Sequence, residues 1–258
     1  MPIAGAVLEL RDVGVRYSAT SVLHDVTFSV SHGELIGVIG PNGAGKSTLF
    51  KAICGLVNHD GEVDVNGVHC HNRVDRMDVA YIPQNNAADL LFPITVGELV
   101  VSGRRRFKRW FQRMDGADRE AARVALGSVG LDGFENRSLA ELSGGQLQRA
   151  FIARALTQQA SVMLLDESLS GVDQTTSAEL FNLFQTLAAG GTTLLIATHD
   201  LALARRRFGR LLAINKTLCG DGSAAVVLDP IVLDATFGSA APRRAKSPDD
   251  SGHDALAH

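Results

Sequence analysis

Residues 40–48 read Gly-Pro-Asn-Gly-Ala-Gly-Lys-Ser-Thr, and this stretch decides the fold of the chain. It fits the pattern G-x-x-x-x-G-K-[S/T], whose glycines let backbone N–H groups turn inward around a phosphate. The apolar run Leu35–Ile39 before it has the length of a buried strand. After it, Leu49, Ile53 and Leu56 share one face of a helix. The sequence therefore predicts a strand, a phosphate-binding loop and a helix, whose N-terminus offers unpaired donors to the anion.

Two side chains of this stretch supply a charge and a metal ligand. Lys46 offers a point charge to the β- and γ-phosphates of a nucleotide, and the Ser47 hydroxyl is placed to bind Mg²⁺. A chance Gly-rich turn is the structural alternative, and the fit of both flanks argues against it. The predicted nucleotide-binding residues of the loop are Gly40, Pro41, Asn42, Gly43, Ala44, Gly45, Lys46, Ser47 and Thr48.

Length and composition bound the class of protein. The chain has 258 residues, enough for one large domain or two small ones. Its apolar content of 45% and its net charge of −3 are typical of a globular protein and disfavour one that coats nucleic acid. Cys54, Cys70 and Cys219 form no closely spaced framework, which favours a reducing cytoplasm. We expect neither a signal peptide nor a membrane span, so another subunit would have to cross a membrane.

Three apolar stretches are predicted to be strands that end in polar side chains. The first ends at Gln84, the second ends at Asp166, and His199 follows the third. In open parallel sheets ligands bind beyond the carboxyl ends of the strands, so we expect these side chains to share one site. Gln84 and Asp166 are candidate Mg²⁺ ligands, Asp166 through water. Glu167 would orient or deprotonate an attacking water, although a helix N-terminus also favours negative charge.

A second anion site is predicted at Leu142–Gln146, which opens a helix. Ser143 stands in the N-cap position, and Gly144 and Gly145 leave backbone N–H groups accessible at the helix start, where Gln146 follows. This site lies about 100 residues beyond the first. One phosphate bound between the two sites is an economical explanation for having both.

Tyr17 lies between two β-rich stretches, Val7–Val15 and Val22–Val30. An aromatic ring at that place is suited to stacking on a nucleotide base. The alternative is an ordinary edge-strand residue. Near the other end of the chain we expect closing strands, followed from residue 240 by a disordered tail of small, charged and proline residues. The expected closing strands are Arg210–Asn215, Lys216–Cys219 and Ala225–Leu228.

Two stretches allow more than one interpretation. His69 and His71 invite a metal site, but no fourth ligand lies nearby in the sequence, so a solvated loop is the better interpretation. A metal-binding regulatory role for these histidines and for His253 and His258 stays open. Arg104–Arg113 interleaves basic and aromatic residues, which suits either an anionic membrane surface or a solvated helix end.

Taken together, these motifs resemble those of the nucleotide-binding subunit of an ABC transporter, over roughly residues 7–235. Several motifs in register are far more specific than any one of them. The residues that carry the resemblance are Tyr17 (the A-loop aromatic), Gly40–Ser47 (Walker A), Gln84 (the Q-loop), Leu142–Gln146 (the signature), Asp166 and Glu167 (Walker B and its catalytic Glu), Ser170–Asp173 (the D-loop) and His199 (the switch His).

The resemblance implies a fold and a domain division. The fold class is α/β, a P-loop NTPase (RecA-like) core with an antiparallel β subdomain and an inserted α-helical subdomain. The ATPase domain would occupy residues 1–239, the helical subdomain would be inserted at about 86–157, and residues 240–258 would form the disordered tail.

The resemblance also implies cofactors and partners. The cofactors are ATP and Mg²⁺, and the catalytic residues would be Glu167, His199 and Lys46. Two chains would pair head to tail, so that the signature of one chain closes over the γ-phosphate held by the other. The pair would sit at the cytoplasmic face of the membrane on polytopic permease subunits, served by an extracytoplasmic metal-binding protein, with no nucleic acid involved.

A narrower resemblance points to the branch that imports manganese, zinc or iron, with iron-chelate importers next to it. It rests on Phe92–Val96, Gly103-Arg104, Asp118–Ala121 and Gly171–Asp173. One departure is Ser168, where the family usually has the proline that stiffens the turn after the catalytic Glu.

Other ABC systems are the alternatives to a metal importer. An exporter or a different importer would use the same motor. A soluble DNA-repair ATPase of this class carries a long coiled coil after Gln84, and the 85–141 segment is too short for one. A translation-type ATPase carries two cassettes in one chain, whereas this chain has one.

Overall fold

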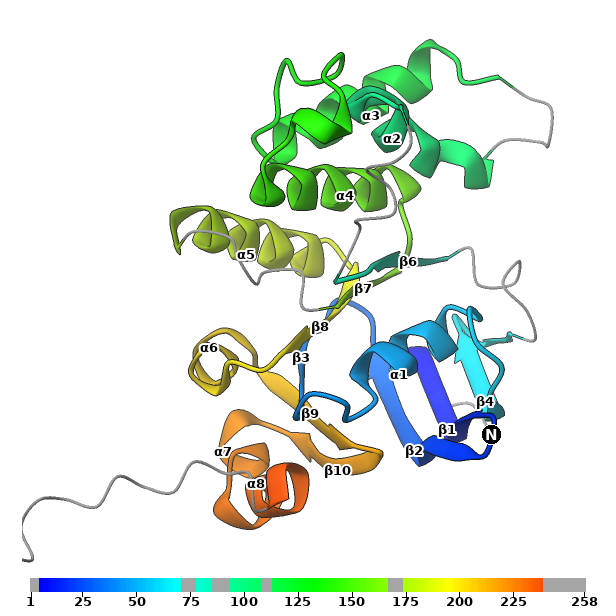
Figure 1. Ribbon diagram of the computed structural model, residues 1–258, viewed down its shortest axis with the longest axis vertical. Coiled ribbons are helices and arrows are strands. Elements are labelled where there is room, and N and C mark those ends of the chain that lie inside the picture. The colour runs from blue at the N-terminus through cyan, green and yellow to red at the C-terminus, as the bar shows by residue number, and fades with distance from the viewer. Residues whose placement is uncertain (1–4, 71–77, 85–92, 108–112, 167–173, 239–258) are drawn as a thin grey trace, which may run out of the picture.

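The computed structural model describes residues 5–70, 78–84, 93–107, 113–166 and 174–238. Within these ranges the chain forms two β-sheets and helices that cover them (Figure 1). The predicted α/β class is confirmed. None of the described helices is long and apolar enough to cross a membrane.

The larger sheet has six strands in the order β10-β9-β3-β8-β7-β6. The strands β9, β3, β8, β7 and β6 run parallel, and β10 closes the edge antiparallel to β9. Every residue of β7 and β8 is buried, as expected where helices cover both faces of a parallel sheet. The bounds are β3 Leu35–Ile39, β6 Val79–Ile82, β7 Val162–Asp166, β8 Thr193–Thr198, β9 Arg210–Asn215 and β10 Thr217–Gly222.

The smaller sheet is antiparallel, in the order β2-β1-β4-β5. Its first two strands form a long hairpin, and the turn between β4 and β5 uses Asn66 and Gly67, both with positive φ. Positive φ at both central residues is what the tight hairpin turn of an Asn-Gly pair requires. The bounds are β1 Ala6–Tyr17, β2 Thr20–Ser31, β4 Asp60–Val65 and β5 Val68–His69.

Three consecutive helices form a group of their own (Figure 1). The helices α2, α3 and α4 lie between β6 and β7 in sequence and pack on one another. The bounds are α1 Lys46–Ile53, α2 Val96–Val101, α3 Gly116–Ser128, α4 Gly144–Gln158, α5 Gln174–Ala189, α6 Leu201–Arg207, α7 Ala224–Val227 and α8 Pro230–Phe237, with short 3₁₀ turns at Ser102–Phe107 and Leu139–Glu141.

The six-stranded sheet separates two hydrophobic cores. Along β7, Met163 and Leu165 face the core shared with α4 and α5, whereas Val162 and Leu164 face the core shared with α1 and the antiparallel sheet. This alternation follows from the two-residue repeat of a strand. Figure 1 shows the same division, with α5 and α6 on one side of the sheet and α1 on the other.

Two local expectations were wrong. Ala225–Leu228, expected as a strand, contains most of helix α7, because four apolar residues carry no usable periodicity. Val227 of this helix is buried and Val226 is 55% exposed. Leu56, expected on the helix after the phosphate loop, lies beyond its end, since α1 stops at Ile53 and Gly55 adopts a positive φ.

Thr193 joins the start of β8 to the turn that leads into β3. Its side chain is fully buried; the hydroxyl accepts a hydrogen bond from Gly33 N at 3.0 Å and donates one to Ser31 O at 3.0 Å. This turn sets where β3 begins, and β3 leads directly into the phosphate loop.

We predict that Thr193→Val lowers the free energy of unfolding by about 1–3 kcal/mol, because it removes the partner of the Gly33 N–H without changing side-chain volume. Urea denaturation measures the change. The matched control is Thr186→Val, which removes a hydroxyl bonded to Asn182 O on the exposed face of α5 and should change stability by less than about 0.5 kcal/mol. Equal losses in the two variants would contradict the prediction.

Candidate functional site

The phosphate loop lies between the end of β3 and the start of α1, as predicted. Gly43 and Gly45 adopt φ values of 78° and 99°, which L side chains rarely tolerate. Gly45 is the N-cap of α1, so Lys46 and Ser47 occupy the first turn. The first N–H groups of a helix have no partner within it, so a helix that starts at the end of this loop offers them to an anion.

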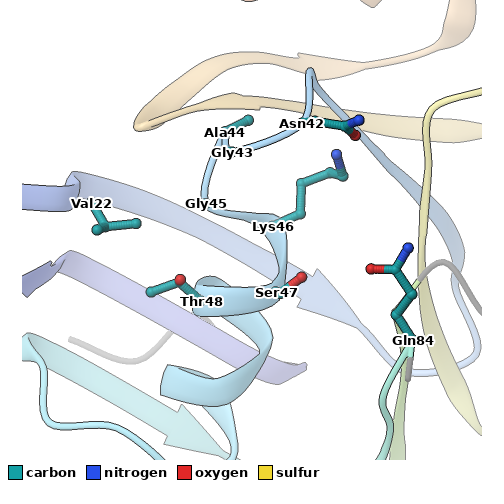
Figure 2. Close-up of a pocket in the computed structure, with 9 residues that line it drawn as sticks. All are labelled: Val22, Asn42, Gly43, Ala44, Gly45, Lys46, Ser47, Thr48 and Gln84. Carbon is teal, nitrogen blue, oxygen red and sulfur yellow. The ribbon is translucent and has the colours of Figure 1, made fainter. Parts of the chain in front are cut away.

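A cavity of about 360 Å³ opens in front of this loop. Figure 2 shows the side chains of Lys46, Ser47 and Gln84 around its space, so the structure brings together three residues that the sequence predicts for one site. The residues that line the cavity are Val22, Asn42, Gly43, Ala44, Gly45, Lys46, Ser47, Thr48 and Gln84.

Lys46 is held by the loop itself. Its side chain is nearly buried, with 5% of the residue exposed, and its Nζ donates to Gly40 O at 2.7 Å and to Pro41 O at 3.1 Å. Burying an ammonium without such acceptors would be costly. The loop carbonyls therefore keep the charge at the mouth of the cavity, where a phosphate oxygen can reach it.

The back of the loop rests on the β9–β10 hairpin. A Cβ at Gly40 would overlap the carbonyl oxygen of Ile214 in β9. Lys216 N donates to Ala44 O at 2.9 Å, and Lys216 O accepts from His24 N at 2.8 Å. Backbone groups of β9 and of the β9–β10 turn thus contact the loop, and the turn is itself bonded to β2.

Asp166 ends β7 and is 2% exposed. The hydroxyl of Tyr81 on the neighbouring strand β6 donates to its Oδ2 at 3.2 Å. Burial and then the charge of Asp166 raise the pKa of Tyr81 above its usual range, so the phenol stays protonated and donates.

Ser143 caps α4 as predicted. Gln146 N donates to Ser143 Oγ at 3.3 Å, and Ser143 N donates to Gln146 Oε1 at 3.0 Å, which completes a capping box. A Cβ at Gly144 or Gly145 would meet nothing within 4 Å, so the helix start is open. None of these residues is among those that line the cavity at the phosphate loop.

A family described as "ABC transporter" matches residues 23–170, more than half of the chain. The chain belongs to the ABC transporter family. It is 38% identical to the manganese transport system ATP-binding protein MntB of Halalkalibacterium halodurans, over 90% of this chain and 92% of that protein. It is 37% identical to the zinc transport system ATP-binding protein TroB of Treponema pallidum, over 97% of this chain and 95% of that protein.

Solved ABC cassettes have the same fold, which confirms the P-loop NTPase class. The ADP conformation of an ATP-binding cassette is 26% identical, with a TM-score of 0.76, over 89% of this chain and 97% of that one. A dimeric cassette in a post-hydrolysis state, bound to ADP and Pi, is also 26% identical, with a TM-score of 0.74, over 84% of this chain and 98% of that one.

The other motif residues of this ABC cassette lie at strand ends or outside the described residues. Tyr17 ends β1 and is 45% exposed, and it is not among the residues that line the cavity. His199 directly follows β8 and is exposed. Glu167 lies outside the described residues, as do Ser168 and the D-loop stretch 170–173.

Two residues of the site escaped the sequence analysis. Val22 lines the cavity from β2, and the Tyr81 hydroxyl donates to the carboxylate of Asp166. A signal existed for each. Val22 is the first residue of the β-rich stretch Val22–Val30 that follows Tyr17, and strand alternation places Tyr81 on the same face of β6 as Val79. Neither signal identifies the partner across the site, because that depends on the pairing of distant strands.

His69 does not stand in a solvated loop. It lies in β5, where its Nδ1 is 2.7 Å from Asp64 Oδ1. Among the described residues, no group of three His, Cys, Asp or Glu side chains is placed to hold a metal ion. His71, His253 and His258 lie outside those residues.

We predict that Gly40→Ala destabilises the chain more than Gly43→Ala. The added methyl at Gly40 would overlap a backbone carbonyl of β9, which cannot rotate away, whereas nothing lies within 4 Å of one at Gly43. The Gly43 variant should lose only the cost of a positive φ, about 1–2 kcal/mol. Urea denaturation of the two variants decides the order, and a smaller loss at Gly40 would refute it.

Proposed function

We propose that this ABC ATPase powers the import of a divalent metal ion, manganese, zinc or iron, through a separate membrane permease. The cavity that brings Lys46, Ser47 and Gln84 together supports the nucleotide chemistry. The manganese and zinc transport relatives, which match this chain over most of its length, support the cargo. An iron-chelate importer is the alternative with the same motor.

The residues present fit an Mg²⁺ nucleotide. The Ser47 hydroxyl, the Gln84 carboxamide and the Asp166 carboxylate are all oxygen donors, the kind that Mg²⁺ prefers. Bound Mg²⁺ would neutralise charge on the β- and γ-phosphates. We assign Ser47, Gln84 and, through water, Asp166 to holding it.

Side chains of this chain would bind the nucleotide and activate the attacking water. Lys46 would move from the loop carbonyls onto the γ-phosphate, and His199 would contact the same group. Glu167 would orient the attacking water and take its proton. Tyr17 would stack on the base, and the loop residues from Gly40 to Thr48 would bind the phosphates through backbone N–H groups.

We propose that two copies of the chain pair head to tail. The capped helix start at Ser143, with Gly144, Gly145 and Gln146, does not line the cavity of its own chain. A partner chain would bring that anion site to the γ-phosphate. A related cassette forms a dimer with ADP and Pi, which supports the arrangement.

We also infer a place in the cell and a division of the chain. Polytopic permease subunits would hold the pair at the cytoplasmic face of the membrane, with an extracytoplasmic metal-binding protein on the other side. The ATPase domain would span 1–239, with the helical subdomain at about 86–157, which agrees with the mutual packing of α2, α3 and α4. Residues 240–258 lie outside the described residues, and their disorder stays a prediction.

We predict that Glu167→Gln keeps ATP binding and lowers hydrolysis by about 10²–10⁴-fold, because the amide cannot accept the proton of the attacking water. With ATP bound and not hydrolysed, the dimer should accumulate, as size-exclusion chromatography would show. The matched control is Glu120→Gln, an exposed carboxylate paired with Arg123 on α3, which should leave turnover unchanged. Wild-type hydrolysis in the Glu167 variant would refute the role of this residue.

We predict that the chain, affinity-purified from native membranes, brings a polytopic permease of the metal-importer class with it. The purification should be repeated after metal chelation of the growth medium. Identifying the permease by mass spectrometry tests the cargo and the location together. Recovery of ribosomes, of DNA-bound proteins or of no membrane partner would contradict the transporter assignment and leave the ATPase assignment standing.

A further inference from the structure

Tyr81 and Asp166 face the same side of two paired strands. The strands β6 and β7 run parallel, with Tyr81 opposite Leu164. Since side chains alternate along a strand, Asp166 projects from β7 on the same face as Leu164, one step closer to the carboxyl end of the sheet. Both Tyr81 and Leu164 pack in the core shared with α1, the helix that begins with Lys46 and Ser47.

Tyr81 and Asp166 are joined by a hydrogen bond with a defined donor and acceptor. The Tyr81 hydroxyl donates to Asp166 Oδ2 at 3.2 Å, and the carboxylate is almost completely buried. A buried carboxylate without donors would be costly and free to change rotamer. Gln84 comes two residues after β6 ends at Ile82, and it lines the cavity.

We propose that Tyr81 is a positioning residue, whose hydroxyl holds the Asp166 carboxylate in the orientation that binds the nucleotide's Mg²⁺. This inference rests on the metal role of Asp166 in the proposed function. Tyr81 touches neither nucleotide nor metal and acts through Asp166, as outer partners of metal ligands do elsewhere. Gln84 comes two residues after the end of β6, so the bond between Tyr81 and Asp166 also anchors the strand that leads to Gln84.

The same two strands carry a matched control at their other ends. Asp78 precedes β6 and Ser161 precedes β7, and the Ser161 hydroxyl donates to Asp78 Oδ2. Ser161→Ala therefore removes a hydroxyl–carboxylate hydrogen bond between the starts of β6 and β7, together with the bond that Asn66 Nδ2 donates to the same hydroxyl, far from the carboxyl edge of the sheet. Tyr81→Phe removes one at that edge and keeps the ring.

The test is a titration with Mn²⁺, which replaces Mg²⁺ and gives a sharp EPR spectrum when free. The wild-type chain, Tyr81→Phe, Ser161→Ala and Asp166→Asn are each loaded with one equivalent of a non-hydrolysable ATP analogue. Loss of the free-ion signal, compared with the same titration of the analogue without protein, gives the Mn²⁺ affinity of the complex. Thermal denaturation of every variant, and affinity for the analogue in EDTA, are measured alongside.

We expect Tyr81→Phe to bind Mn²⁺ about 10-fold more weakly than wild type, with unchanged affinity for the analogue in EDTA. Ser161→Ala should bind Mn²⁺ as wild type does, even if both variants melt earlier. Asp166→Asn should be weakened at least as much as Tyr81→Phe.

Three other outcomes would each overturn a specific statement. Wild-type Mn²⁺ affinity in Tyr81→Phe, together with weak binding in Asp166→Asn, would refute the role of Tyr81 and leave the role of Asp166 intact. Wild-type affinity in Asp166→Asn would refute the metal role of Asp166, and the inference about Tyr81 with it. Equal weakening in Tyr81→Phe and Ser161→Ala would show a general loosening of the strand pair, which also refutes a positioning role.

Discussion

The close approach of Gly40 to the carbonyl oxygen of Ile214 is the constraint on which the site depends. A glycine is needed there because any side chain would push the phosphate loop away from β9. With the loop seated, the hydrogen bond from Lys216 N to Ala44 O closes its back and the first turn of α1 faces the cavity. The anion site is therefore preorganised by backbone packing before any nucleotide arrives.

The same packing controls the charges of the site. Lys46 is buried against two loop carbonyls, and Asp166 is buried at the end of β7 with a tyrosine donor. Burying either charge without hydrogen-bond partners would be costly, so these bonds help to keep both side chains at the site.

The phosphate loop and the helix caps could be predicted from the sequence, because each is encoded within a few residues. The glycines specify positive φ values, and Ser143 with Gln146 specifies a capping box. The helix α7 was mistaken for a strand because four apolar residues fit either element. The bond between Tyr81 and Asp166, and the fact that Ser143 does not line the cavity, depend on how segments far apart in the sequence pair and pack. No local pattern carries that information.

The order of strands in the larger sheet has a consequence for biosynthesis. β3, residues 35–39, pairs with β8 at 193–198 and β9 at 210–215, so its neighbours leave the ribosome long after it does. At about 5–20 residues per second, the apolar β3 waits on the order of 10–30 s for a partner. The β1–β2 hairpin can form early, since its contacts are local. The nascent chain thus exposes an apolar strand without its neighbours for most of its synthesis. We expect it to depend on chaperones that bind such segments until β8 and β9 have been synthesised.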